Sequence, residues 1–544
     1  MRAGLESPKR GTPQDPLRTR GSRNHVGQIR MPRRKAADAD LLTQLAVQVL
    51  RQTRGNRIGV ERCRIPGRAV RIRRHVFVHG SCLPDGINRE RGTGTFFACP
   101  QNDCAANWAD VLQYGKPMNL TARLVVMNFL QFFVWGAWLL TLGAYWFNNK
   151  HWSGAHFGAA FSTMGIAAII TPPIMGVIAD KWINAEKLYG VMHLGGAAAL
   201  FSLPLVASPT VFFWVLLLNM LCYMPSLSLA ITVAYNALKN AGRDTVTSFP
   251  PIRVWGTVGF IAALHTVSLL GLETSTGQFY VAGTAALLLG LYAFTLPPCR
   301  PKLSSSASSG PGRTTVADRF GLTAFTLFQQ RKLAVFFIFA MLLGGALQLT
   351  NAYGDTFLHD FADVAEYRNL FAVEHPAIIM SISQISETLF ILAIPFFLRR
   401  FGIKTVMLMS MVAWTLRFGL FAYGDPGDGL WMIVLSCIVY GMAFDFFNVS
   451  GSLFVEDQCG PEIRASAQGL FMLMTNGLGA MLGSLISGAV IEYFFTYPDD
   501  GKDWRGIWLS FAGYALVITI AFFVLFRPEP GGNTDEKAPA TVGV

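Results

Sequence analysis

Long apolar runs separated by short polar turns fill the sequence from residue 118 onward. A helix needs about 20 mostly apolar residues to cross the roughly 30 Å hydrocarbon core of a bilayer. The runs of this kind predict an all-α membrane protein with twelve transmembrane helices. They lie near residues 124–147, 157–179, 188–207, 211–235, 249–270, 279–296, 333–357, 376–398, 406–423, 430–455, 465–495 and 507–526.

A polar stretch after the sixth run divides these helices into two sets of six. It contains SSSASSGPG and then the amphipathic piece 317–330, which predict a flexible linker and a helix on the membrane surface. The predicted domains are a basic, disordered N-terminal extension (1–117), a six-helix bundle (118–296), a cytoplasmic linker (297–332), a second six-helix bundle (333–528) and a cytoplasmic tail (529–544).

Composition agrees with a membrane protein, since 52% of the 544 residues are hydrophobic and only 14% are charged. The formal net charge of +12 comes from residues 1–117, which hold 22 Lys+Arg and 9 Asp+Glu, a net of +13, and leave a net of −1 for the rest. This segment shows no nucleic-acid motif, so no nucleic-acid partner is predicted. Because the membrane pattern starts at Met118, we hypothesise that the native chain begins there; the alternative is a cytoplasmic arm.

Lysine and arginine are unequally shared between the two sides of the predicted helices. With the first helix starting inside, 17 of them lie on that side and four on the opposite side. Acids, among them Asp355, Asp360 and Asp425, gather where cations are few. Cytoplasmic loops carry an excess of cations. Both termini are therefore predicted to be cytoplasmic.

The loop after the second predicted helix reads Gly176-Val-Ile-Ala-Asp180-Lys181. It resembles the signature of the major facilitator superfamily between helices two and three, and the layout of six plus six helices is typical of that superfamily. Gly176 would allow close helix packing. Asp180 and Lys181 complete a predicted gating motif whose contacts break when the carrier opens, the alternative being an ordinary solvated loop.

Four charged side chains fall inside predicted spans: Arg253, Glu387, Arg417 and Asp445. A charge in the membrane interior costs at least a few kcal/mol, so such residues normally face a cavity, pair with one another, and mark the path of a substrate or of protons. Arg417 could instead neutralise one of the acids, and His265 is expected to pack between helices rather than to relay protons. Neither residue is therefore included in the predicted site.

Amides, hydroxyls and aromatic rings recur around these charges at helical spacing. The fifth helix carries a cation, a hydroxyl and a ring on one face, the seventh and eighth carry amide or carboxylate pairs three residues apart, and the tenth carries two rings beside an acid. The predicted substrate-binding residues are Arg253, Thr257, Phe260, Gln348, Asn351, Gln384, Glu387, Tyr440, Phe444 and Asp445.

These residue types suit a nucleoside. Amide pairs match the donor and acceptor edge of a nucleobase, Arg and carboxylates bind ribose hydroxyls, and aromatic faces stack on a base. A buried carboxylate that takes up a proton on one side and releases it on the other would couple transport to protons, so Glu387 and Asp445 are the candidates. The alternative is that such side chains only join helices, at roughly 0.6 to 2 kcal/mol each.

Other chemistries find little support. Four cysteines lie within residues 1–117 and the other four are far apart, so no disulfide or metal framework is predicted. The sequence shows no metal-ligand spacing, nucleophile elbow or phosphate loop. We therefore expect neither an enzyme nor a metal site.

Several segments carry a family resemblance: MNLTARLVVMNFLQFFVWGAWLLTLG, FPPIRVWGTVGF, SISQISETLFILAIPFFL, FAYGDP, YGMAFDFFNVSGSLFVE and IRASAQG. From Met118 to about Pro528 the chain is similar to the bacterial nucleoside:proton symporter family of the major facilitator superfamily. The family's own N-terminal MNL matches the residues at Met118, which agrees with a native start there.

The resemblance implies a major facilitator fold of two six-helix bundles with alternating access. It implies import of purine and pyrimidine nucleosides, such as uridine and adenosine, across the bacterial inner membrane, driven by the proton gradient without a cofactor. The ten predicted binding residues match the family's residue types. A monomer in the lipid bilayer is expected. The alternatives are a sugar or oligosaccharide:proton symporter and, more remotely, a membrane protein that is not a transporter.

Overall fold

The computed structural model describes residues 119–301, 322–460, 463–498 and 501–526. The predicted N-terminal extension, the start at Met118, most of the linker and the tail 529–544 lie outside these residues. Within them the chain is helical, and the one β-bridge pairs Thr496 with Lys502 in a loop. The all-α prediction is confirmed for this part of the chain.

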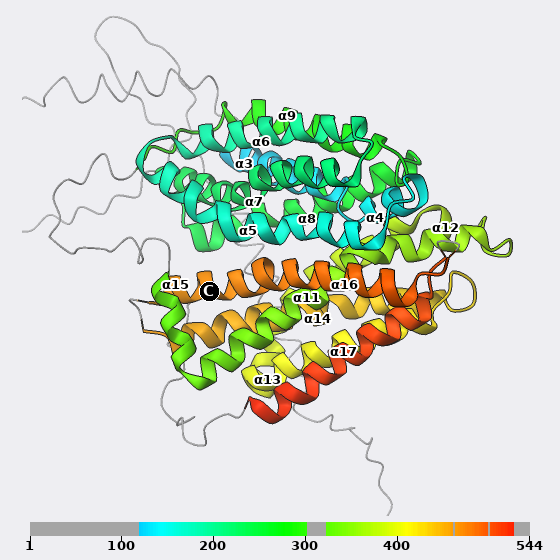
Figure 1. The fold of residues 1–544 in the computed structure, drawn as a ribbon. Coiled ribbons are helices and arrows are strands. Elements are labelled where there is room, and N and C mark those ends of the chain that lie inside the picture. The colour runs from blue at the N-terminus through cyan, green and yellow to red at the C-terminus, as the bar shows by residue number, and fades with distance from the viewer. Residues whose placement is uncertain (1–118, 302–321, 461–462, 499–500, 527–544) are drawn as a thin grey trace, which may run out of the picture. The chain divides into compact units, whose positions relative to one another are not determined.

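The first half of the described chain forms one group of helices, drawn in blue to green in Figure 1. Its α-helices pack against one another mainly through α3 with α8, α5 with α7, and α6 with α9. The elements are α3 (Leu120–Gly136), α4 (Leu142–Ala144), the π-helix η1 (Tyr145–Asn149), α5 (Gly154–Lys181), α6 (Ala185–Ser202), the 3-10 helix η2 (Leu203–Leu205), α7 (Pro209–Asn240), α8 (Thr245–Leu269) and α9 (Gly277–Ala293). We call this group the N-bundle.

The second half forms the C-bundle, in yellow-green to red in Figure 1, where α13 packs against α14 and α17 and α11 packs against α16. Its elements are the 3-10 helix η4 (Leu322–Gln329), α11 (Arg331–His359), the 3-10 helix η5 (Asp360–Asp363), α12 (Phe371–Glu374), α13 (Pro376–Tyr423), α14 (Leu430–Gln458), α15 (Arg464–Met472), the π-helix η6 (Leu473–Gly479), α16 (Ala480–Phe495) and α17 (Trp504–Leu525).

The observed elements depart from the predicted spans in three places. The span 124–147 is interrupted, because turns follow α3 and a π-helix follows α4. The span 465–495 contains the π-helix η6, an irregularity that is frequent at functional sites. The described part of the predicted amphipathic helix 317–330 is a 3-10 helix. Hydrophobic periodicity does not report such local changes in helix winding.

Gly402 separates two helices within α13. The element has 48 residues, about 72 Å at 1.5 Å per residue, which exceeds a single crossing of the bilayer. Gly402 has φ 74° and ψ 166°, a backbone conformation that is essentially restricted to glycine. The chain therefore turns at Gly402, between the predicted spans 376–398 and 406–423.

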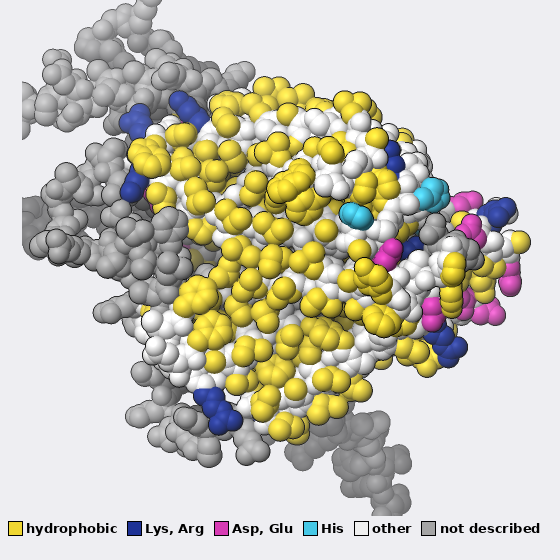
Figure 2. Space-filling model, in the orientation of Figure 1, with side chains coloured by type: hydrophobic (Ala, Val, Ile, Leu, Met, Phe, Trp, Pro, Cys, Tyr) yellow, Lys and Arg dark blue, Asp and Glu magenta, His cyan; other side chains and the backbone are white. Residues whose placement is uncertain are grey.

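The outer surface of the described bundles is apolar between two charged ends. Nine described helices are long and apolar enough to cross a membrane, and α3 and α9 are shorter apolar helices. Figure 2 shows hydrophobic side chains along the helices and acidic side chains gathered at one end. We call this the acidic end; it carries Asp360, Asp363, Glu366, Asp425 and Asp428. The opposite, basic end carries Lys181, Lys187, Lys239, Arg243 and Arg464.

The two bundles meet along α5 with α16 and along α8 with α13. At the first contact two glycines approach closely, since a Cβ built on Gly488 would lie 2.7 Å from the Cα of Gly158. Small residues allow this approach, which favours helix association in membranes. Nearby, the backbone N–H of Gly154 donates to Glu492 Oε2 at 2.6 Å.

All hydrogen bonds found between the bundles in the described residues lie near the acidic end. Besides Gly154 with Glu492, Ser268 Oγ lies 3.0 Å from His375 Nδ1, and His359 Nε2 lies 2.6 Å from Glu273 Oε2. At the basic end the described hydrogen bonds stay within one bundle, as between Arg243 and Thr121. The bundles are thus held together at the acidic end in this conformation.

We expect Gly402→Ala to destabilise the protein, because alanine must adopt the positive φ at a cost of about 1 to 3 kcal/mol. Thermal unfolding of the purified protein in detergent measures this. Gly419→Ala, in the same element, is the control, since a Cβ there meets no atom within 4 Å and no positive φ is involved. Equal melting temperatures for the two variants would contradict the assigned role of Gly402.

Candidate functional site

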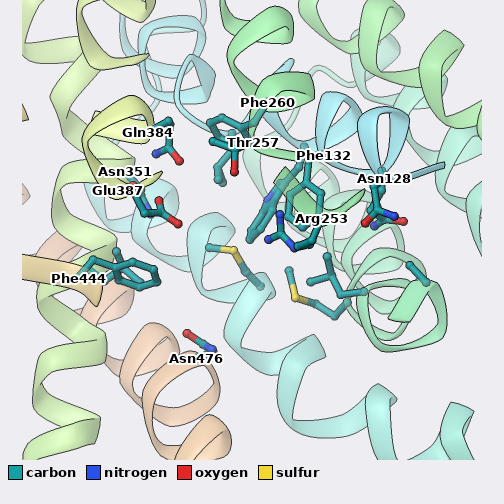
Figure 3. A pocket seen from close by; sticks show the side chains of 18 of the residues that line it. Asn128, Phe132, Arg253, Thr257, Phe260, Asn351, Gln384, Glu387, Phe444 and Asn476 are labelled. Carbon is teal, nitrogen blue, oxygen red and sulfur yellow. The ribbon is translucent and has the colours of Figure 1, made fainter. Parts of the chain in front are cut away.

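A cavity of about 370 Å³ lies between the two bundles. It receives side chains from α3, α5, α7 and α8 of the N-bundle and from α11, α13, α14 and η6 of the C-bundle (Figure 3). Its polar and aromatic lining residues are Asn128, Gln131, Phe132, Trp135, Arg253, Thr257, Phe260, Gln348, Asn351, Gln384, Glu387, Tyr440, Phe444 and Asn476. The structure therefore brings together nine of the ten residues predicted to bind substrate.

Helix α8 supplies the N-bundle cation. Asp244 caps its N-terminus by accepting hydrogen bonds from the N–H groups of Val246 and Thr247 at 3.2 and 3.1 Å. Hydrogen bonds from the Thr247 side chain and the Val246 backbone hold the pKa of Asp244 below its usual value. Further along α8, the guanidinium carbon of Arg253 lies 4.0 Å from the centre of the Phe132 ring. Such a cation–π contact holds the guanidinium at the cavity wall (Figure 3).

Two further α8 residues follow Arg253 along the same wall. Thr257 and Phe260 both line the cavity, as their spacing predicted. Phe260 packs edge-on against Trp135 of α3, with ring centres 6.4 Å apart. The mixed polar and aromatic face of α8 is therefore continuous with α3.

The C-bundle wall combines amides, a carboxylate and stacked rings. Gln348 is 5% exposed, and its Oε1 has no hydrogen-bond partner in the described residues. Tyr440 and Phe444 are stacked on α14, with ring centres 5.8 Å apart and planes 4° apart. Gln384 and Glu387 project from α13 toward the cavity (Figure 3). This wall offers the uncommitted acceptor of Gln348 and further amide and carboxylate groups beside an aromatic surface.

Arg253 and Glu387 are the charged side chains of the lining, one on each bundle. Among the described residues, no ion pair within 4.0 Å joins them; the pairs found are elsewhere. Figure 3 shows the two side chains on opposite sides of the cavity. A ligand with hydroxyl groups between them can accept hydrogen bonds from the guanidinium and donate to the carboxylate.

Asp445 is the one predicted binding residue that is not among those lining the cavity in this conformation. It follows Phe444 directly, and successive helical residues are rotated by about 100°, so the two cannot share a face. Asp445 is only 4% exposed, and its Oδ2 lacks a hydrogen-bond partner in the described residues. It is a buried acid beside the cavity wall.

No ion pair of Arg417 with an acid is found in the described part of the chain. Arg417 is 1% exposed, and its Nη1 donates to the carbonyl of Ser436 at 2.7 Å. Its guanidinium carbon lies 4.6 Å from the centre of the Tyr440 ring, so Arg417 packs against a residue that lines the cavity. His265 Nδ1 lies 2.9 Å from the carbonyl of Ile261 in its own helix, outside the cavity lining.

Sequence reasoning missed the α3 side of the cavity. Asn128, Gln131, Phe132 and Trp135 all line it. Their spacing of three, four and seven residues marks one helix face, a signal available in the segment MNFLQFFVW. Asn476, from the π-helix η6, was also missed.

Gln131 is the centre of a buried hydrogen-bond network behind α3. Its Oε1 accepts from the Tyr189 hydroxyl at 2.6 Å and lies 2.9 Å from His193 Nε2. Its Nε2 donates to Ser226 Oγ at 2.9 Å. Since Gln131 and His193 are 0% and 2% exposed, water does not replace these partners. The network fixes the Gln131 amide at the cavity wall.

The predicted gating motif lies at the basic end of α5. A Cβ on Gly176 would meet no atom within 4 Å, so the expected close packing at this glycine is wrong for this conformation. Asp180 is exposed, and no hydrogen bond or ion pair of this residue is found in the described part of the chain. Lys181 Nζ lies 6.0 Å from the Trp182 ring. Within the described residues, no hydrogen bond or ion pair joins Asp180 or Lys181 to the C-bundle.

Apolar helices in two bundles around a shared polar cavity, closed at one end, define a membrane transporter. The model of the family described as Nucleoside H+ symporter matches residues 118–530, and the chain belongs to this family. It is therefore a nucleoside:proton symporter of the major facilitator superfamily, as the sequence resemblance predicted, and a multi-pass membrane protein.

Similar proteins agree with this assignment. A xanthosine permease of Escherichia coli (strain K12) is 54% identical over 411 residues, which cover 75% of this chain and 96% of the permease. Nucleoside permease NupG of the same organism is 51% identical over 412 residues, with the same coverage. A crystal structure of nucleoside transporter NupG matches with a TM-score of 0.71 and 50% identity, covering 76% of this chain and all of that one.

We expect Gln131→Leu to lower stability by about 2 kcal/mol or more, because the buried polar groups of Tyr189, His193 and Ser226 lose a partner. Thermal unfolding in detergent measures the loss. Asn128→Leu is the control, since the one hydrogen bond found for the Asn128 side chain among the described residues is to the carbonyl of Leu124 in its own helix, at 2.9 Å. A smaller loss for Gln131→Leu than for Asn128→Leu would show that the network is not a stabilising unit.

Proposed function

We propose that this chain imports nucleosides together with protons across the bacterial inner membrane, by alternating access of the cavity between its bundles. The observation that carries the proposal is the lining itself: amides, one guanidinium, one carboxylate and stacked rings converge from both bundles on a single cavity. The family membership supports nucleosides over the sugar symporter alternative.

The proposed binding mode divides the ligand between the two walls. The amides of Gln348, Asn351 and Gln384 pair with the edge of the base, and Tyr440 with Phe444 contacts its face. Arg253 and Glu387 bind the ribose hydroxyls from opposite sides. Because the ligand touches both bundles, its binding favours the conformations in which they approach each other.

The proposed orientation places the basic end in the cytoplasm. Cations concentrate on the cytoplasmic side of membrane proteins, and the basic end carries residues such as Lys181, Lys239 and Arg243. The bundles are joined by hydrogen bonds at the acidic end. In this orientation the structure is inward-facing, with cytoplasmic termini.

The proposed topology has twelve crossings in two sets of six. Nine helices qualify by length and composition, α3 and α9 are shorter apolar helices, and Gly402 divides α13 in two. We propose the domain boundaries 118–296 and 333–528 for the two bundles, and a monomer as the functional unit, because one chain supplies both walls of the cavity.

We assign the coupling proton to Asp445 rather than to Glu387. Glu387 faces the cavity, where the ligand engages it, whereas Asp445 is buried beside the wall with an unpartnered carboxylate oxygen. A charge held there without a partner is costly. Proton uptake removes that cost and allows the bundles to move with a neutral residue in the membrane interior.

Uptake of radiolabelled uridine by cells that lack other nucleoside transporters tests the function. We expect the full-length chain to accumulate uridine and a protonophore to abolish this accumulation. Unlabelled adenosine and xanthosine are then added to compare how strongly each competes with uridine.

Arg253→Gln is expected to lower uptake by about tenfold or more, because a charged hydrogen bond to the ligand is lost. His265→Gln, on the same helix but outside the lining, should stay within about twofold. No uptake by well-expressed, membrane-inserted protein would defeat the proposal.

The coupling assignment is tested in proteoliposomes. We expect Asp445→Asn to lose uptake driven by a pH gradient but to keep exchange of labelled for unlabelled uridine, since exchange needs no net proton movement. Glu387→Gln should lose both, because it removes a ligand contact. If Asp445→Asn still accumulates uridine in response to a pH gradient, a residue other than Asp445 carries the coupling proton.

A further inference from the structure

Three ionisable side chains meet at the acidic end, away from the cavity. His359 Nε2 lies 2.6 Å from Glu273 Oε2 and 3.7 Å from Asp355 Oδ2. Glu273 follows α8 in the N-bundle, whereas Asp355 and His359 belong to α11 of the C-bundle. The cluster therefore joins the two bundles.

Local structure holds each of the three residues in place. Asp355 and His359 are four residues apart on α11, so they lie on one helix face, one turn apart. Gly271, with φ 64°, turns the chain after α8 and directs it toward Glu273. The Glu273 carbonyl then accepts a hydrogen bond from Gln278 Nε2 at 2.8 Å. The ligand-bearing loop is thus anchored to its own bundle.

With both carboxylates ionised, the cluster would hold more negative charge than its own groups can balance, since even a protonated imidazole offsets only one of them. Asp355 and Glu273 are 1% and 3% exposed. Both oxygens of Asp355 and Oε1 of Glu273 have no hydrogen-bond partner among the described residues. The nearby cation Lys502 is paired with Asp360 at 3.6 Å. Such a buried, uncompensated carboxylate is stabilised by binding either a proton or a metal cation, and here three ligand-type side chains converge on one point.

We propose that Glu273, Asp355 and His359 form a binding site for a divalent transition-metal ion, with Zn²⁺ as the best fit. One ligand atom from each residue lies within 4.8 Å of the other two. An imidazole with two carboxylates is a donor set that zinc accepts, at about 2.0 to 2.2 Å per bond. Tetrahedral ligands at that radius are about 3.3 Å apart.

Binding requires only a small local adjustment. The distance of 3.7 Å between His359 and Asp355 is already close to the tetrahedral spacing. Glu273 Oε2, at 2.6 Å from the imidazole, must retreat by less than about 1 Å as the ion replaces the proton between them. The His359 side chain is 13% exposed, which gives the ion a route from the acidic end. Sequence analysis missed the site because Glu273 and His359 are 86 positions apart.

An ion bound to both bundles ties them together at the acidic end. In the proposed orientation this end faces outward, so external Zn²⁺ would hold the carrier inward-facing and inhibit uptake. Metal binding itself does not rest on the proposed function; the inhibition does.

Zn²⁺ binding is measured on the purified full-length protein in detergent, by calorimetry and by the shift in melting temperature. We expect wild type to bind one Zn²⁺, and His359→Gln and Glu273→Gln to bind at least about tenfold more weakly. Glutamine at 359 keeps a hydrogen-bond donor toward Glu273, and melting without Zn²⁺ reports whether each variant is folded. The control is His156→Gln, an exposed histidine at the same end that should leave the affinity unchanged.

Equal affinities for wild type, His359→Gln and Glu273→Gln, or no Zn²⁺ binding by wild type, would overturn the site. In a second arm, external Zn²⁺ should inhibit uridine uptake by wild type and by His156→Gln but not by His359→Gln. Binding without any uridine uptake by wild type would refute the proposed function and leave the metal site standing. Inhibition that is equal in all three proteins would remove the link between this site and transport.

Discussion

A polar side chain in the interior of a membrane protein must find polar partners inside the protein, and the arrangement of the two bundles follows from this constraint. The outer faces of the helices are apolar, so mid-helix polar groups such as Gln131, Gln348 and Arg417 are turned inward, toward the cavity or toward a neighbouring helix. Where polar groups are fully paired, as around Gln131, the wall is fixed. Where they are left unpaired, as at Gln348, the cavity retains binding capacity.

The two ends of this interface differ in the contacts they hold. At the acidic end a glycine contact between α5 and α16 and three hydrogen bonds join the bundles. At the basic end Asp180 stands exposed, and Gly176 has open space around it. Each contact at the acidic end is small and local, so it can be exchanged for contacts at the other end without rebuilding either bundle. This asymmetry is what a carrier with two alternating conformations needs.

The success of the sequence predictions depended on whether the deciding information was local. The face formed by Arg253, Thr257 and Phe260 follows from helical spacing, and the structure places all three along the cavity. Asp445 lies outside the cavity lining, because adjacency in sequence is not adjacency on a helix face. Asp355, expected among acidic loops, is buried in α11. Its partner Glu273 comes from the other bundle, and only the tertiary fold brings such distant residues together.

The hydrogen bonds of Gln131 also limit what the cavity can recognise. With Oε1 accepting from Tyr189 and from His193, and one amide hydrogen given to Ser226, the side chain retains a single uncommitted N–H. Turning the amide over would place Oε1 against Ser226 Oγ, whose only hydrogen is already donated to the carbonyl of Tyr223, so the observed orientation is favoured. Because Gln131 is 0% exposed and both acceptor sites of Oε1 are occupied, this point of the wall offers a ligand no acceptor, and a ligand N–H or O–H placed there remains unpaired.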